Sequence, residues 1–181
     1  RENLSAKVSV VCGSLVVVPS IAREYLRQSL KEAQVEFYPI GQLDESEYVE
    51  VRVSRRQSLL VAAVTELFNQ GIIQVLIGTK SLLGEGWDAP SVNSLILASF
   101  VGSFMLSNQM RGRAIRTWIK NPEKTSNIWH LASINPYKIN NPFKQESQDI
   151  QIDLGENSRD LSLLKRRMEH FLGLSYDGKT I

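Results

Sequence analysis

The chain has few residues that could hold a fold together through covalent bonds or a metal ion. Its 181 residues include one cysteine, Cys12, and two histidines. One cysteine cannot form an intramolecular disulfide, and no Cys/His cluster has the spacing of a zinc site, so we expect no metal centre. Because Cys12 lies in an apolar run, we expect a buried and unreactive thiol. The length is sufficient for one domain with a sizeable core.

Long apolar runs and an excess of one charge are also missing. No stretch approaches the roughly 20 apolar residues that span a bilayer, and the start of the chain lacks the apolar segment of a signal peptide. Lys and Arg number 21 against 19 for Asp and Glu, which excludes a polycation that coats nucleic acid over its whole surface. We therefore expect a cytoplasmic fragment of a longer protein, with no membrane partner and with phosphate bound only by a local patch.

Apolar, β-branched segments alternate with helical patterns, which predicts an α/β fold with a mainly parallel sheet between crossover helices. The last part of the chain is more polar and contains one amphipathic pattern. We predict one domain over 1–136, then a linker and a helical extension over 137–181. The expected strands are 15–18, 35–38, 49–53, 72–77, 94–98 and 128–131, and the expected helices are 20–34 with Ser20 as its cap, 56–69 with Gly71 as its stop, 103–117 and 157–172.

Two arginines in the helix expected over 103–117 form the first candidate site. Gln109, Arg113 and Arg116 have the spacing i, i+4, i+7, which places them on one narrow stripe of a helix. A guanidinium is always charged and presents a planar fork of donors, so two on one face can hold phosphate oxygens. Gly112 beside them would let a bound cofactor approach closely. For a single arginine, a solvated helix face is the more common interpretation.

The same residues resemble a known family when they are taken with the segment before them. Gln109-Met-Arg-Gly-Arg-Ala-Ile-Arg116 matches the form Gln-x-x-Gly-Arg-x-x-Arg, which is motif VI of the superfamily 2 helicases and translocases. Gly86 and Asp88, preceded by Thr79, resemble motif V of that family. The wording of residues 82–90 is similar to the branch that contains type III restriction subunits and excision-repair helicases. The resemblance covers roughly residues 13–134.

The resemblance implies a RecA-like three-layer fold, the second of two lobes in an ATP-dependent motor. It implies that Arg113 and Arg116 are arginine fingers and that Gln109 bridges the γ-phosphate or the facing lobe. Asp88 would accept hydrogen bonds from the ribose hydroxyls of ATP, helped by the close approach that Gly86 permits. From the residues alone, Asp88 could also be a turn-forming residue before Ala-Pro.

The resemblance also implies contacts with nucleic acid. Thr79 follows a strand at its carboxyl end and would hold a backbone phosphate. Lys80 beside it departs from the residue that the family often carries there. Pro19 and Ser20 resemble motif IV and could share this role. The partners implied are the N-terminal RecA-like lobe of the same polypeptide and nucleic acid, with DNA favoured over RNA and both left open.

The catalytic half of such a motor is not in this sequence. Gly78-Thr-Lys-Ser81 is not a Walker A motif, because that motif requires Gly directly before Lys. No buried strand ends in a Walker B pair, so ATP and Mg²⁺ would be held mainly by the absent lobe, and we expect no ATP hydrolysis by this fragment alone. Two interpretations remain: a motor lobe, or a non-enzymatic α/β docking or regulatory module that keeps the fold. Trp87 is expected to pack rather than to stack on a base.

Overall fold

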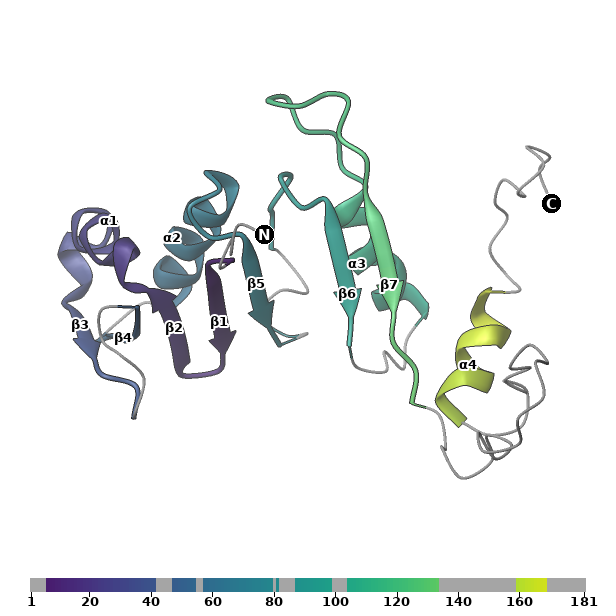
Figure 1. Cartoon of the computed structure of the whole chain (residues 1–181), viewed down its shortest axis with the longest axis horizontal. Helices are drawn as coiled ribbons and strands as arrows, with labels where there is room; N and C mark the ends of the chain where they lie inside the picture. Colours follow the sequence, from purple (N-terminus) through teal and green to yellow (C-terminus); the bar gives the residue numbers. More distant parts are fainter. Residues whose placement is uncertain are drawn as a thin grey trace, which may run out of the picture. The chain divides into compact units, whose positions relative to one another are not determined.

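The computed structural model describes residues 6–41, 47–54, 57–79, 81, 87–98, 104–133 and 159–168 (Figure 1). These residues form a mixed α/β structure that divides into two compact units. The first unit comprises Arg1–Asn93 and Gln109–Asn127, and the second comprises Ser94–Asn108 and Ile128–Ile181. The predicted domain boundary at residue 136 lies outside the described residues. Each unit is described by itself below.

The first unit contains a five-stranded sheet with the strand order β3-β4-β2-β1-β5. The register places Val11 opposite Val16 and Val18 opposite Val49, so their side chains share one face. The strands are β1 (Val8–Cys12), β2 (Leu15–Pro19), β3 (Val35–Tyr38), β4 (Tyr48–Val53) and β5 (Val75–Gly78).

The prediction of a mainly parallel sheet is wrong for this unit. Three of its four strand pairings are antiparallel, and only β1 and β5 run parallel. The cause is a hairpin that the sequence analysis missed, in which β1 turns directly into β2 through Gly13 and Ser14. Gly13 has φ +55, the left-handed conformation that tight hairpin turns require. A connection this short can join only antiparallel strands, whereas parallel strands need a long crossover.

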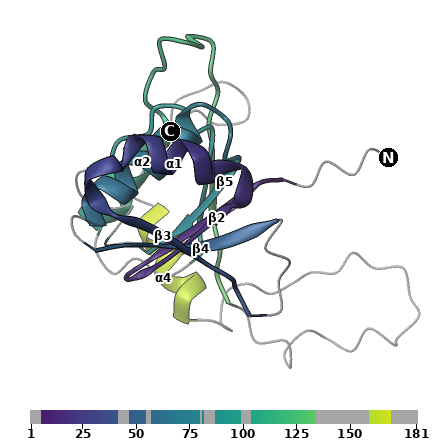
Figure 2. The ribbon, with the colours of Figure 1, turned by 90° about the vertical axis from the view of Figure 1, so that its left-hand side faces the viewer.

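Two helices cover one face of the sheet, α1 (Arg23–Ser29) and α2 (Gln57–Asn69), which lie side by side in Figure 2. Val16, Val18 and Val51 on the strands are fully buried beneath Leu26 of α1 and Leu67 of α2. The sheet valines recur every second residue, as a half-buried strand requires. The strand and helix periodicities therefore converge on one apolar core.

Helix α2 ends where the sequence predicts. Gly71 has φ +76, and its N–H donates to the carbonyl of Phe68 at 3.0 Å. The N–H of Ile72 reaches the carbonyl of Leu67 at 3.0 Å. These two hydrogen bonds form a Schellman motif, which satisfies carbonyls that the last turn leaves open. Gly71 is confirmed as the stop of this helix.

Three local predictions differ from the structure. Ser20 begins a short 3-10 helix, Ser20–Ala22, and does not cap α1 with its side chain. Cys12 is exposed because it ends β1 beside the hairpin turn. The strand expected over 72–77 is β5, which begins later, and Ile77 within it is 53% exposed rather than buried.

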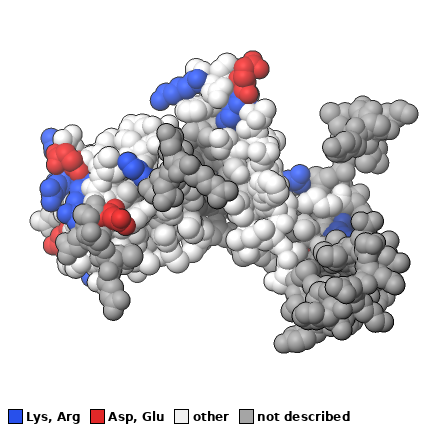
Figure 3. Space-filling view, viewed as in Figure 1, with Lys and Arg blue, Asp and Glu red and all other residues white. Residues whose placement is uncertain are grey.

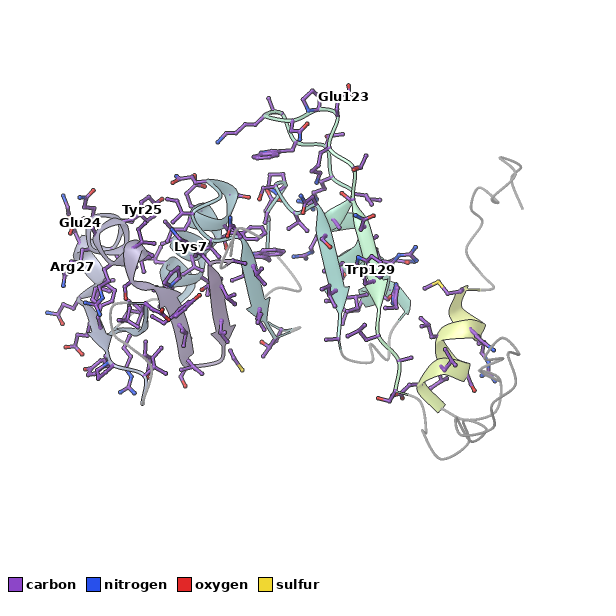
Figure 4. The ribbon with its side chains drawn as sticks, viewed as in Figure 1. Lys7, Glu24, Tyr25, Arg27, Glu123 and Trp129 are labelled. Atoms are coloured by element: carbon purple, nitrogen blue, oxygen red, sulfur yellow. The ribbon has the colours of Figure 1, made fainter. Side chains whose placement is uncertain are left out.

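The second unit contains a two-stranded sheet of β6 (Ser94–Leu97) and β7 (Asn127–His130). The N–H of Leu131 donates to the carbonyl of Leu97 at 3.1 Å, and Trp129 projects from β7 (Figure 4). The amphipathic helix expected over 157–172 is α4 (Arg159–Met168). Among the described residues, none of the helices could cross a bilayer.

Candidate functional site

The helix that carries the arginines, α3 (Phe104–Ala114), is shorter than predicted. Gln109 and Arg113 lie on it one turn apart, but Arg116 follows the helix by two residues. The predicted stripe of three residues therefore holds only for the first two. Gln109 is exposed and Arg113 is half-buried. The position of Arg116 depends on what holds the chain after the helix.

Both arginines contact the segment at Trp87 and Asp88, which lies before β6 in the sequence. Arg113 donates from Nη1 to the backbone carbonyl of Trp87 at 2.6 Å, across 26 positions of the chain. Arg116 forms an ion pair with the carboxylate of Asp88, across 28 positions. The two side chains of the pair are 49% and 65% exposed, so water screens their attraction. The structure thus joins the two sequence motifs that carry the family resemblance.

Trp87 anchors this segment to the core of the first unit. Its indole N–H donates to the hydroxyl of Thr65 at 2.9 Å. Thr65 is buried on α2, and its hydroxyl donates in turn to the carbonyl of Val61 at 2.7 Å. Trp87 is half-buried. The indole hydrogen bond to Thr65 places the backbone carbonyl of Trp87 where Arg113 can reach it.

The chain after α3 is tied back by Lys124 and Ser126. The Lys124 ammonium donates to the carbonyls of Pro90 at 2.8 Å, Val92 at 2.7 Å and Ala114 at 2.9 Å. The Ser126 hydroxyl donates to the carbonyl of Ala114 at 2.5 Å. Burial lowers the pKa of the Lys124 ammonium below its ordinary value. We call residues 87–92 and 113–126 together the arginine segment; Glu123 lies at the far end of its loop (Figure 4).

The exposed groups of the arginine segment have the chemistry to hold an anionic ligand that also carries hydroxyls. The guanidinium of Arg116 offers several N–H donors, and the carboxylate of Asp88 has more acceptor sites than one arginine fills. At Gly112, an added Cβ would meet no atom within 4 Å, so internal packing does not require glycine there.

The residues predicted to contact nucleic acid are not all brought together. Thr79 follows β5, and its N–H donates to the carbonyl of Val11 at 3.3 Å. Pro19 ends β2, which runs antiparallel to β1, so it lies at the opposite end of the sheet from Thr79. Ser20 after it is held through its N–H, which donates to the carbonyl of Glu47 at 2.8 Å. Lys80 and Gly86 lie outside the described residues.

The visible surface carries charges of both signs. Figure 3 shows Lys and Arg side chains beside Asp and Glu side chains on the described part of the first unit. On α1 and β4, Arg27 lies over the Phe37 ring and Arg52 over the Tyr38 ring, at 5.2 and 4.7 Å from the ring centroids. Glu36 and Glu50 lie beside them, the latter paired with Arg52 at 2.6 Å. This surface is a mixture of charges rather than a phosphate-binding patch.

Lys124, Thr65 and Ser126 were not found by the sequence analysis. Each binds backbone or a residue far along the chain, and no short motif marks such a contact. The described residues contain no group of three or more His, Cys, Asp or Glu side chains that could hold a metal ion. Comparison with protein families, with curated proteins and with solved structures finds no match to this chain.

Proposed function

We propose that this chain is the second motor lobe of a superfamily 2 nucleic-acid-dependent ATPase, with a RecA-like ancestry. The observation that supports the proposal is the contact of Asp88 and Trp87 with Arg116 and Arg113. Two motifs recognised separately in the sequence meet at one place on the surface. A carboxylate that can accept from hydroxyls and two guanidinium groups that can bind phosphate are the groups that a nucleotide site requires.

In this proposal the chain contributes groups to a nucleotide held mainly by another lobe. Asp88 accepts hydrogen bonds from the ribose hydroxyls, and Arg113 and Arg116 bind the phosphate oxygens, with Gln109 at the lobe interface. ATP supplies the phosphoryl group whose transfer drives the motor, and the other lobe holds Mg²⁺. Developing negative charge on phosphate is the reason for placing two guanidinium groups there.

The proposed track is nucleic acid, with DNA favoured over RNA because of the wording of residues 82–90. Thr79 is the proposed backbone contact, because it stands at the carboxyl end of the parallel pair β1 and β5. Pro19 and Ser20 are not part of this proposed contact, since the sheet register places them at the other end.

The test is the ATPase activity of the complete parent protein, with and without single-stranded DNA, duplex DNA and RNA. Removal of one arginine finger is expected to lower stimulated turnover by about 10²-fold or more in Arg113→Ala and Arg116→Ala. Arg27→Ala is the matched control, because Arg27 is an exposed arginine whose guanidinium packs over Phe37. Turnover that is absent, or indifferent to both arginines, would favour the docking module instead.

A further inference from the structure

The ammonium of Lys124 is held by three backbone carbonyls that come from two separate parts of the chain. Pro90 and Val92 belong to a turn in which the N–H of Val92 donates to the carbonyl of Ala89 at 3.2 Å. Ala114 is the last residue of α3 and is fully buried. An ammonium has three N–H donors, and here each finds one carbonyl acceptor. The lysine therefore joins the turn to the end of the helix.

The turn and the end of α3 both have carbonyls that a cation can stabilise. The carbonyls of the last helical turn have no partner within the helix, and the C-terminal end of a helix carries partial negative charge. The carbonyl of Ala114 is one of these, and it accepts from both Lys124 and Ser126. Three acceptors that converge on one nitrogen suit a compact ammonium; the planar fork of an arginine spreads its donors over several positions.

The two parts that Lys124 joins are also the two parts that carry the Asp88–Arg116 pair. Asp88 lies one residue before the turn that begins at Ala89, and Arg116 lies two residues after Ala114. We propose that Lys124 is a positioning residue, which fixes the turn and the helix end so that Asp88 and the two arginines present one constellation. The functional meaning of that constellation rests on the proposed motor function; the positioning itself does not.

The first test observes the ammonium in the unaltered chain by nitrogen-15 NMR of labelled lysine side chains. If three carbonyls hold it, the Lys124 ammonium protons exchange with water much more slowly than those of Lys120. Lys120 is an exposed lysine of the same loop and serves as the control. Equal exchange rates for Lys124 and Lys120 would overturn the proposal without the use of any variant.

The second test follows Trp87 by fluorine-19 NMR after incorporation of 5-fluorotryptophan, which gives one signal for each of the three tryptophans. In Lys124→Met, the Trp87 signal is expected to move toward its position in the unfolded chain, while the Trp129 signal stays. Lys120→Met is expected to leave both signals in place. A folded Lys124→Met chain with an unchanged Trp87 signal would overturn the proposal.

A variant that fails to fold is recognised by loss of its cooperative urea unfolding transition. In that event Lys124→Arg is used instead, because it keeps the positive charge but cannot direct three donors to the same three carbonyls. An unchanged Trp87 signal in Lys124→Arg would then overturn the proposal. In the complete parent protein, Lys124→Met is expected to lower stimulated ATPase while Lys120→Met does not. If the parent has no ATPase, the proposed function fails, whereas the shift of Trp87 still tests the positioning role.

Discussion

The apolar core and the arginine segment are held by different forces. In the core, Val16, Val18 and Leu67 have no exposed surface, and the residues around them are apolar. In the arginine segment, the contacts are hydrogen bonds from Arg113, Lys124 and other polar groups to backbone and side-chain oxygens. Apolar packing is non-directional and broadly distributed, whereas each of these hydrogen bonds depends on one geometry. The segment can therefore rearrange without unfolding the core.

The arginine segment is expected to open locally before the apolar core unfolds. Regions with few buried apolar contacts open at lower free energy than the core of the same protein. Within the arginine segment, the buried apolar side chains are small ones, Ala89, Val92 and Ala114.

The largest effect is expected from a cavity in the core. Leu67→Ala on α2 should lower the free energy of unfolding by about 2–5 kcal/mol, because a fully buried leucine is lost from a packed site. Leu59→Ala on the same helix is the control, since Leu59 is 40% exposed. Urea denaturation measures both. An equal loss of unfolding free energy in Leu67→Ala and Leu59→Ala would mean that Leu67 is no more important to the core than Leu59.

The second effect concerns the anchor between the two regions. Thr65→Val keeps the shape of the side chain but removes the acceptor for the Trp87 indole N–H. We expect a loss of about 1–3 kcal/mol, because a partly buried donor is left without its partner. Hydrogen exchange should also accelerate at residues 87–92. Thr117→Val, at an exposed threonine, should change neither quantity.

A smaller effect is expected at the surface pair of Asp88 and Arg116. A double-mutant cycle with Asp88→Asn and Arg116→Ala should give a coupling free energy of about 0.2–1 kcal/mol, because both side chains are largely exposed. The coupling should fall as salt is added. A coupling that is large and independent of salt would show that the pair is a structural part of the fold, contrary to this prediction.

The smallest effect is a pH dependence carried by Lys124. Burial lowers its pKa from the ordinary 10.5, so between the two values the unfolded chain binds more protons than the folded chain. The free energy of unfolding contributed by this group therefore rises with pH in that alkaline window and is constant below it. The free energy of unfolding is measured by urea denaturation at several pH values for the wild type and for Lys124→Met. The difference between the two gives the contribution of Lys124. A difference that falls with pH would contradict the prediction.

The parts of the fold with local signals could be predicted from the sequence. Helix α2 follows from apolar residues at helical spacing, and its end follows from Gly71. The antiparallel sheet could have been found from the two-residue turn at Gly13, which lies between apolar runs. The alternation of apolar segments with helical patterns led instead to the expectation of parallel strands.

The candidate site was only partly predictable for a different physical reason. Arg113, Arg116 and Asp88 were selected by resemblance; the structure pairs Arg116 with Asp88 and bonds Arg113 to the neighbouring carbonyl of Trp87. Lys124 was not selected, because its acceptors are backbone carbonyls that lie 10, 32 and 34 positions away. Every residue has such a carbonyl, so no pattern of side chains in the sequence predicts this contact. Only the folded chain shows which carbonyls converge.

The use of backbone acceptors has a consequence for how the sequence can vary. Arg113 and Lys124 end on carbonyls of residues 87, 90, 92 and 114, whose side chains take no part in these hydrogen bonds. A change of side chain at Pro90 removes no acceptor, whereas a change at a donor position removes the contact. At residue 87 the side chain also matters, because the indole holds the backbone through Thr65. A saturation mutagenesis map should therefore tolerate substitution at Pro90 better than at Arg113 or Lys124.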